Sequence, residues 1–431
     1  MLSPTPSSTV IVPNFLNLPH GICTANPTNI QHLLQSNFSN YVKGSRFHDV
    51  LHELLGDGIF NVDGNLWTVQ RKIASHDFNT KSLRNFISDT VESGISNRLL
   101  PYLSAASLAE KPTDLQDVLQ RFTFSNVLKV AFGIEVDLNE KEVDNLQFVR
   151  AFDLAVEIAS SRFTSPLPLT WQLKRFLRIG CEARFADAIK VIDIYAMEII
   201  KSREKEQENE WLGRENRDLL SRFLSLNDIV SFDDGNHKRK FLRDIIICFI
   251  LAGKDSTSTA LTWFFWLISA HPRVAELIYT ELMSVATAAA EEEKEKEKEV
   301  FVLRYDELKN LHYLHAALSE SMRLFPPLPI NSRLAVEDDV LPDGTHVKRG
   351  VFRPFDQFQY PVFHGGPRIC LGKEMAYVQM KSVAASILHE YEIVALDGGG
   401  TAEKMMNPPY MLSLTLKMKG GFPVKLKRRR H

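Results

Sequence analysis

The sequence predicts a mainly helical fold with small β-sheets near the two ends of the chain. Apolar residues recur at intervals of three and four through most of the chain, which is the spacing of helices that bury one face. Alternation typical of strands is confined to short terminal stretches. Of the 431 residues 44% are apolar, as in globular proteins, and a formal net charge of −2 provides no general attraction to nucleic acid.

The helical spacing is clearest in six stretches, residues 29–38, 80–103, 114–132, 186–201, 241–270 and 308–325. Pro272 is expected to open a further helix, because proline is tolerated in a first turn. Pro326 is expected to end the last of the six.

Strands are predicted at residues 8–13 and 413–427, where a hairpin would turn at Gly420–Gly421. Two highly charged segments, residues 201–216 and 291–299, are expected to be solvated helices or disordered loops rather than partner sites. The basic tail KLKRRRH is expected to be a solvated terminus, the alternative being a patch for a membrane surface or a partner. No internal repeat is evident, and we expect a single domain over residues 1–431.

Cysteine usage indicates a reducing compartment. The four cysteines are far apart and form no CxxC pair, which argues against a disulfide framework or a structural zinc site: Cys23, Cys181, Cys248 and Cys370. Cys248 lies in an apolar run and is expected to be a core thiol. The first fifteen residues do not have the pattern of a signal peptide. Charged residues interrupt the long apolar stretch 241–270, so a buried helix is expected there rather than a membrane span.

One cysteine lies in an unusual glycine-rich stretch, FHGGPRICLG. It fits the pattern F-x-x-G-x-R-x-C-x-G at Phe363, Gly366, Arg368, Cys370 and Gly372. A thiolate is a soft, strongly donating ligand for haem iron, and glycines let backbone N–H groups approach it. The helix expected directly after Gly372 would lower the thiol pKa. Arg368 offers a planar cation to a carboxylate such as a haem propionate. The alternative is a glycine turn around a structural cysteine.

A second constellation, AGKDST, interrupts the long buried helix with Asp255, Ser256 and Thr257. A carboxylate and hydroxyls inside an apolar helix are costly unless they form bonds or move protons. Cleaving dioxygen on iron needs two delivered protons, and these three residues could relay them. The alternative is a hydroxyl that bends the helix beside a solvated Asp255.

Two further residue pairs are too common to indicate a function by themselves, and they are informative only because of their order in the chain. Trp67 and Arg71 lie four apart on one helical face, where both could donate to carboxylate oxygens of a cofactor. Glu320 and Arg323 lie three apart on a later helix and can form an ion pair. Packing and an ordinary surface pair are the alternatives.

Taken in order, W-x-x-x-R, A-G-x-D-S-T, E-x-x-R and the cysteine motif resemble the cytochrome P-450 superfamily of haem-thiolate monooxygenases. Short segments such as LAGKDSTSTALTWFFW are similar to sequences of the plant fatty-acid ω-hydroxylase branch. Relatives in that branch also oxidise jasmonoyl–amino acid conjugates. The resemblance implies a mainly α fold with small edge β-sheets and a haem b cofactor. It also implies O₂ and an NADPH-dependent cytochrome reductase as partners, and the cytosolic face of the endoplasmic reticulum as location.

The resemblance also assigns roles. Cys370 would be the axial ligand; Trp67, Arg71 and Arg368 would hold propionates; Glu320 and Arg323 would lock the core. Asp255 with Ser256 or Thr257 would serve oxygen activation. Substrate contacts would come from four segments: residues 45–62, Phe249–Thr257, the turn Leu328–Ser332 and the strand Tyr410–Leu412.

The sequence departs from the family pattern in two places. The family's amino-terminal membrane anchor is not seen ahead of the first strand, although membrane association is still possible. The connection between Arg323 and Cys370 is short, so the fold is expected to lack a segment after about residue 350. Without that segment Glu320 and Arg323 would be a buried pair that lacks its third member, at a cost of about 3–5 kcal/mol. Arg353 is a poor substitute for that member.

From the resemblance we expect a fatty-acid ω-hydroxylase, with a jasmonoyl conjugate as the other substrate class. The short connection makes an impaired or haem-free remnant the alternative function.

Overall fold

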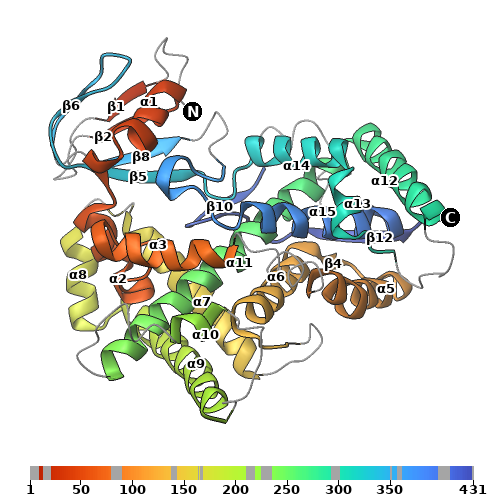
Figure 1. Cartoon of the computed structure of the whole chain (residues 1–431), viewed down its shortest axis with the longest axis horizontal. Coiled ribbons are helices and arrows are strands. Elements are labelled where there is room, and N and C mark those ends of the chain that lie inside the picture. Colours follow the sequence, from red (N-terminus) through yellow and green to blue (C-terminus); the bar gives the residue numbers. More distant parts are fainter. Residues whose placement is uncertain are drawn as a thin grey trace. The chain divides into compact units, whose positions relative to one another are not determined.

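The computed structural model describes residues 9–12, 21–78, 90–136, 143–163, 165, 168–209, 219–224, 235–292, 301–349, 352–356, 362–396 and 408–429 (Figure 1). The chain divides into two compact units, each assembled from three stretches of sequence. Unit 1 comprises Met1–His76, Lys141–Phe249 and Leu328–Cys370, and unit 2 comprises Asp77–Glu140, Ile250–Pro327 and Leu371–His431. The expectation of one domain over the whole chain stays a prediction.

Unit 1 contains the largest sheet among the described residues. Its strand order is β1 (Thr9–Val12), β2 (Gly21–Thr24), β8 (Phe352–Asp356), β5 (Ile330–Ala335) and β3 (Tyr41–Val42) (Figure 1). β8 runs parallel to β2 and antiparallel to β5, so its backbone lies in the interior of the sheet. The predicted strand at residues 8–13 is confirmed as β1, whereas the expected turn Leu328–Ser332 is wrong from Ile330 onward, because β5 begins there. A separate hairpin pairs β6 (Asp339–Val340) with β7 (His346–Val347).

The helices of unit 1 begin with α1 (Pro27–Gln31), which continues as the π-helix η1 (His32–Ser36) and the 3₁₀ turn η2 (Phe38–Asn40). The Asn26 side chain accepts the N–H groups of Thr28 and Asn29, which starts the helix where an N-cap residue and a proline stand together. The remaining helices of the unit are α2 (Gly44–Leu55), α3 (Gly64–Phe78), α7 (Val143–Phe163), α8 (Pro168–Leu177), α9 (Cys181–Asn209) and α10 (Leu219–Leu224). The predictions for 29–38 and 186–201 are confirmed.

Unit 2 is built from η3 (Ile95–Leu99), α5 (Leu100–Leu108), α6 (Leu115–Phe132), α12 (Pro272–Glu292), α13 (Tyr305–Lys309), α14 (His312–Leu324) and α15 (Lys373–Glu390). α6 and α12 confirm the predicted helix at 114–132 and the predicted start at Pro272. Asp114 caps α6, and Gly133 ends it in the left-handed conformation. The predicted helix at 80–103 is helical from Thr90, and its first ten residues lie outside the described part. In the two charged segments, residues 201–209 end α9 and residues 291–292 end α12, whereas residues 210–216 and 293–299 lie outside the described part.

The predicted continuous helix at 308–325 is wrong, because the chain breaks into α13 and α14 at Asn310–Leu311. The carboxylate of Glu281, on α12, accepts the N–H groups of Tyr313 at 2.7 Å and Leu314 at 2.9 Å. Those groups open α14 and have no partner within it, so a distant side chain stabilises the new helix start.

The predicted hairpin at Gly420–Gly421 is also wrong. β11 (Leu416–Met418) pairs with β10 (Tyr410–Leu412), whereas β12 (Pro423–Arg428) pairs with β9 (Tyr391–Ala395) and β4 (Thr113–Asp114). Both glycines have positive φ, and a Cβ on Gly421 would lie 2.2 Å from the Asp114 carboxylate. The two strands therefore separate into different sheets instead of folding back on each other.

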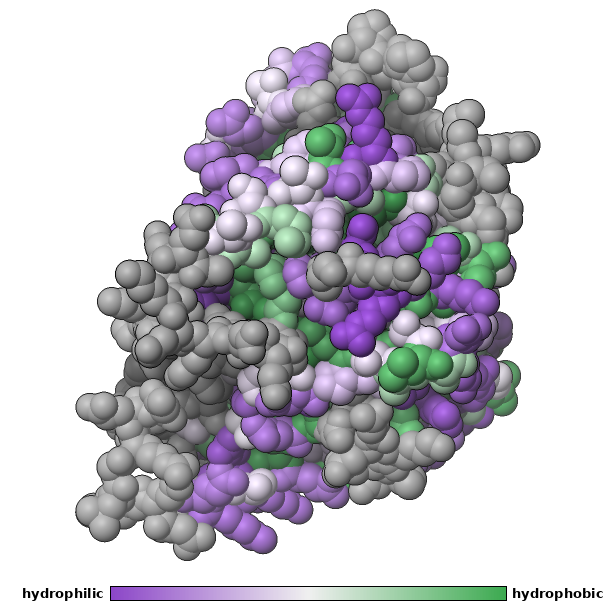
Figure 2. Space-filling view, turned by 90° about the vertical axis from the view of Figure 1, so that its right-hand side faces the viewer, coloured by the Kyte–Doolittle hydropathy of each residue, from purple (hydrophilic) through white to green (hydrophobic). Residues whose placement is uncertain are grey.

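The long apolar stretch forms α11 (Gly235–Ala270), which begins in unit 1 and ends in unit 2. Among the described helices it alone has the length and composition to cross a membrane, and 72% of its apolar window is buried inside the protein. Its four interrupting charges are buried as well, in the ion pairs Arg243–Asp244 and Lys254–Asp255. This burial supports a core helix. On the face drawn in Figure 2, hydrophobic side chains lie in separate groups among hydrophilic ones.

Candidate active site

The cysteine loop of unit 1 is closed by its own backbone. The N–H of Cys370 donates to the carbonyl of Phe363 at 2.8 Å, and the N–H of Ile369 donates to that of Gly366 at 3.0 Å. Gly366 has φ of +60°, and a Cβ there would lie 1.8 Å from the carbonyl oxygen of Leu34. Only glycine fits this approach. The side chain of Cys370 is exposed, so a ligand can reach the sulfur.

Helix α3 brings its predicted pair to this loop. The guanidinium of Arg71 donates to the carbonyl of Ile369, beside Cys370. The guanidinium of Arg368 lies 4.5 Å from the centre of the Trp67 ring and donates to Asp63 Oδ1 at 2.7 Å. The prediction that Trp67 and Arg71 share a face is confirmed, and that face points to the cysteine loop.

Two further cations lie nearby in unit 1 and were missed in the sequence: the buried Arg333 on β5 and the half-buried Lys43 before α2. Arg333 is fully buried; its Nη1 donates to Asn331 Oδ1 at 3.0 Å and its Nη2 to His364 Nε2 at 2.7 Å. Because a guanidinium only donates, His364 Nε2 accepts and Nδ1 carries the proton. The Lys43 ammonium group also reaches Asn331 Oδ1, at 3.4 Å. The sequence showed only a single arginine in a short strand of mixed polarity.

This group of cations has too little negative charge around it. Burial, then the neighbouring Arg368, lowers the pKa of Arg333 to about 9, and burial lowers the pKa of Arg368 to about 10. Burial and the same two arginines hold the pKa of Lys43 well below its usual range. Asp63 is the one carboxylate that raises the pKa of all three groups. Burial and Arg333 lower the pKa of His364 to about 3, so this imidazole is neutral.

The donor set fits a ligand that carries more than one carboxylate. Arg333 Nε is buried without a hydrogen-bond partner among the described residues, and an orphaned buried donor is costly. Haem b carries two propionates, and Arg333, Arg71, Arg368 and Lys43 are cations that such groups pair with. The exposed thiol of Cys370 lies next to this cluster.

In unit 2, Asp255 lies in a buried ion-pair triad. Its Oδ1 is 2.9 Å from Lys254 Nζ on the same helix and 3.3 Å from Lys417 Nζ on β11. Burial alone would raise the pKa of Asp255, but the two ammonium groups outweigh it and hold the pKa below its usual range. Asp255 Oδ2 has no hydrogen-bond partner among the described residues. The alternative of a solvated Asp255 is therefore wrong, since the side chain is fully buried.

Ser256 and Thr257 supply the hydroxyl groups next to Asp255 in the sequence. Ser256 Oγ donates to the carbonyl of Ala252, one turn back, at 2.6 Å, as expected of a hydroxyl in a helix. Thr257 is buried.

Helices α6 and α11 meet next to these residues. Thr123 Oγ1, on α6, donates to the carbonyl of Lys254 at 2.8 Å. A Cβ on Gly253 would lie 2.6 Å from the side chain of Val127, so α6 and α11 approach closely here.

The pair Glu320–Arg323 forms as predicted, with Arg323 Nε and Nη2 donating to the two carboxylate oxygens at 2.7 and 2.6 Å. The expectation that it is buried is wrong, because 55% of the Glu320 side chain and 43% of the Arg323 side chain are exposed. Solvent therefore removes the penalty expected of a buried pair that lacks a third member. The side chain of Arg353 lies outside the described part of the structure.

The family model described as cytochrome P-450 matches residues 21–351 and 355–421, which is most of the chain. The chain belongs to the cytochrome P-450 family. Among its relatives, cytochrome P-450 94A1 of Vicia sativa is 40% identical over 95% of this chain and 82% of its own length. Cytochrome P-450 94B1 of Arabidopsis thaliana is 37% identical over 100% of this chain and 86% of its own length.

A solved structure has the same fold. The crystal structure of the cytochrome P-450DA haem domain superposes with a TM-score of 0.76 at 16% identity, over 99% of this chain and 91% of that one. The resemblance and the fold class read from the sequence are thus confirmed. Cytochrome P-450 proteins are oxidoreductases that bind haem through a cysteine thiolate, and this chain is a monooxygenase of that family. Enzymes of the family use O₂, electrons from redox partners and small-molecule substrates.

Proposed function

We propose that this cytochrome P-450 hydroxylates the ω end of a fatty acid, with electrons from an NADPH-dependent cytochrome reductase at the cytosolic face of the endoplasmic reticulum. The observation that carries the substrate class is the apolar surface on the expected substrate segments. In unit 1, Phe60, Leu328 and Ile330 are exposed, and in unit 2 Tyr410, Met411 and Leu412 are exposed. Exposed apolar side chains on these segments suit an alkyl chain.

The cofactor-binding roles follow from the contacts in unit 1. Cys370 is proposed as the axial ligand, since its sulfur is exposed and its loop is fixed by Phe363 and Gly366. Arg71, Arg333, Arg368 and Lys43 are proposed to hold the propionates, with Trp67 stacked against Arg368. Gly372 precedes the first turn of α15, whose N–H groups favour a thiolate. When bound, a haem with an axial thiolate supplies the activation of O₂.

Asp255, Ser256 and Thr257 are proposed to handle protons. The carboxylate of Asp255 is kept ionised by two lysines, and its Oδ2 is without a hydrogen-bond partner among the described residues. That oxygen can accept a proton and pass it on. Ser256 and Thr257 supply hydroxyls on the next two positions of the same helix.

The second candidate function is an impaired or haem-free remnant, and one finding favours it. The family match is interrupted between residues 351 and 355, within the connection from Arg323 to Cys370. This interruption supports a connection that departs from the family pattern before the cysteine loop.

Purified protein, reduced and treated with carbon monoxide, tests the enzyme against the remnant. The enzyme is expected to give a Soret maximum at the thiolate position, and Cys370→Ala is expected to lose it. Arg333→Gln should weaken haem binding about tenfold or more, the usual magnitude for a charge-assisted hydrogen bond, while Arg349→Gln, at an exposed arginine of the same unit, should not. A thiol-type band or no haem would establish the remnant.

Turnover with added reductase then separates the substrate classes. Fatty acids of medium and long chain are expected to give ω-hydroxy products identified by mass spectrometry. Oxidation of a jasmonoyl–amino acid conjugate in preference to every fatty acid would overturn the proposed substrate while leaving the haem chemistry in place.

A further inference from the structure

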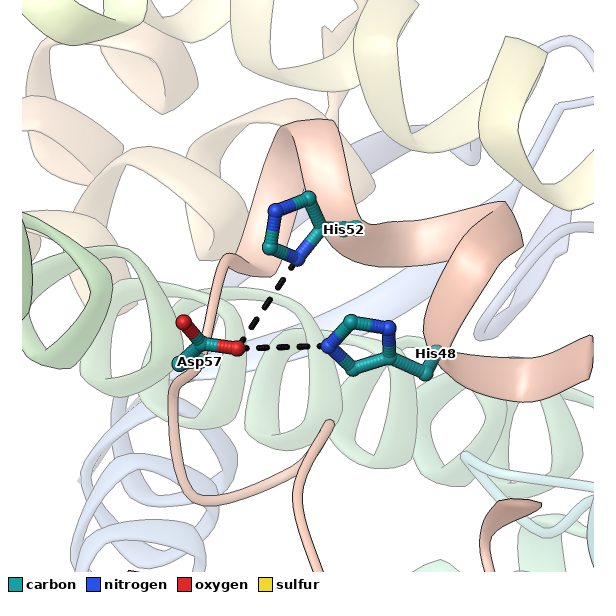
Figure 3. A group of neighbouring side chains, drawn as sticks. All are labelled: His48, His52 and Asp57. Atoms are coloured by element: carbon teal, nitrogen blue, oxygen red, sulfur yellow. Dashed lines mark hydrogen bonds and ion pairs between the residues drawn. The ribbon is translucent and has the colours of Figure 1, made fainter. Parts of the chain in front are cut away.

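Three side chains that the haem site does not use converge at the end of α2, in unit 1. His48 and His52 lie four residues apart, hence on one face of the helix, and Asp57 lies in the turn that follows. Figure 3 shows the two imidazoles directed toward the same carboxylate. All three side chains are partly exposed, between 34 and 45%, so the group lies near the surface of unit 1.

The nitrogen and oxygen atoms that converge are already close to the spacing of metal ligands. His48 Nε2 lies 3.2 Å from Asp57 Oδ1, and His52 Nδ1 lies 3.9 Å from the same oxygen. One ligand atom from each of the three residues falls within 4.8 Å of the others. In a tetrahedral zinc site, bonds of about 2.0–2.1 Å place ligand atoms roughly 3.3 Å apart. Small rotations of the side chains reach that spacing.

The hydrogen bonds within the group leave one imidazole unsatisfied. His48 makes a hydrogen bond to Asp57, but His52 Nδ1 is a buried atom without a hydrogen-bond partner among the described residues. At 3.9 Å its approach to Asp57 is too long for a hydrogen bond. A metal ion at the centre would give this nitrogen a bond. The other nitrogen of His48 lies 3.6 Å from Asp49 Oδ1, and a carboxylate behind a ligating histidine is a common support in zinc sites.

The turn that carries Asp57 is bonded to the interior of unit 1 through its backbone. The backbone N–H of Asp57 donates to Asp244 at 2.9 Å, and its carbonyl accepts from Gln70 at 2.7 Å. Gly56 has φ of +51°, and a Cβ there would lie 2.0 Å from the Asp244 carboxylate; a Cβ on Gly58 would lie 2.4 Å from Cys248 Sγ. Asp57 is therefore placed by its backbone, independently of the two histidines.

We propose that His48, His52 and Asp57 bind one Zn²⁺ ion, with water in the fourth position. Two imidazoles and one carboxylate suit zinc and related first-row transition metals rather than Mg²⁺, which prefers an all-oxygen shell. The ion would cross-link the last turns of α2 to the turn at Gly56–Gly58. Zinc would thus order residues 44–58 of the protein.

The test uses untagged, haem-loaded full-length protein, first freed of metal and then titrated with Zn²⁺ against a chromophoric chelator. Hydrogen exchange is followed by mass spectrometry on the same samples. We expect one zinc ion per chain and slower exchange confined to residues 44–58. His52→Gln and Asp57→Asn should weaken zinc binding at least tenfold and abolish the slower exchange. His346→Gln removes an exposed histidine of the same unit and serves as the matched control.

Equal zinc affinity in wild type and His52→Gln would overturn the site. So would an excess of Mg²⁺ that displaces the zinc. Should the variants fail to fold, the wild-type protein still decides: zinc that leaves exchange in residues 44–58 unchanged, or slows it elsewhere, is bound at another place, and the proposal is wrong.

Discussion

At the scale of single residues, burial decides what the charged side chains can do. Arg333 and Lys254 look ordinary in the sequence, yet both are fully buried. Motif spacing predicted Cys370, Arg71 and Asp255 as candidate site residues, because these stand in fixed patterns. It could not predict Arg333, whose proposed role depends on His364 lying against it after folding. The same limit applies to Asp255: its position in a motif was evident, but its two lysine partners were not.

The triad makes a specific prediction about Asp255. Asp255→Asn removes the carboxylate that Lys254 and Lys417 share, and breaking a buried ion pair typically costs about 3–5 kcal/mol. We expect a loss of that order in the free energy of unfolding, measured with urea at pH 7. Adding Lys417→Met should recover part of it.

Ser256→Ala is the matched control for the same helix turn. Among the described residues its hydroxyl donates only to the carbonyl of Ala252, one turn back, so its removal should leave stability nearly unchanged. Loss of coupling between NADPH use and product in Ser256→Ala would support the proton role without a folding defect. Equal stability of Asp255→Asn and wild type would contradict the triad as described.

At the scale of elements, local signals decided some boundaries and distant partners decided others. α6 was predictable, because its cap residue Asp114, its apolar spacing and its terminal Gly133 all lie within its own sequence. The break between α13 and α14 was not, since it depends on Glu281 from α12. The wrong prediction of a hairpin at Gly420–Gly421 has the same cause. β12 pairs with β9 and β4, which are not its neighbours in the sequence.

The second prediction concerns Asp339, whose carboxylate links β6 to neighbouring segments of unit 1. It accepts from His32 on η1 at 2.8 Å, from Asn37 at 3.0 Å and from the Tyr41 hydroxyl on β3. Burial alone would raise the pKa of Asp339, but these hydrogen bonds lower it to about 2. A depressed carboxyl pKa stabilises the fold above the unfolded value near pH 4, and the contribution is lost as pH falls toward 2.

Asp339→Asn should therefore lower the free energy of unfolding by about 2 kcal/mol at pH 7, and the difference should shrink to about half near pH 3. Urea unfolding at the two pH values measures it. Asp338→Asn, at the adjacent exposed residue paired with Lys348, is the control and should change little. A deficit in Asp339→Asn that stays constant with pH would show that lost packing, rather than lost charge, is responsible.

At the scale of the whole molecule, the order of motifs along the chain carried more information than any motif alone. W-x-x-x-R, A-G-x-D-S-T, E-x-x-R and the cysteine pattern are individually common or short, but together they indicated the family that the comparisons then showed. The sequence also indicated a short connection between Arg323 and Cys370. What it could not give was the consequence, because the exposure of Glu320 and Arg323 emerges only when the chain is folded.

That connection supports the last prediction. The corresponding segment of cytochrome P-450 94A1, inserted at residues 352–354 where the family match is interrupted, should raise haem occupancy. The family resemblance implies that the inserted residues contain the third member of the Glu320–Arg323 network. Glu320→Gln should then become costly, at about 3–5 kcal/mol, whereas in the present chain an exposed pair contributes only about 0–1 kcal/mol.

An insert of the same length made of glycine and serine is the control, because it restores length without supplying a partner. Haem content from the reduced pyridine complex and urea unfolding give the two readouts. If both inserts raise haem content equally, chain length limits cofactor binding and the ion pair does not. If neither insert does, the missing segment does not limit haem binding, and the prediction is wrong.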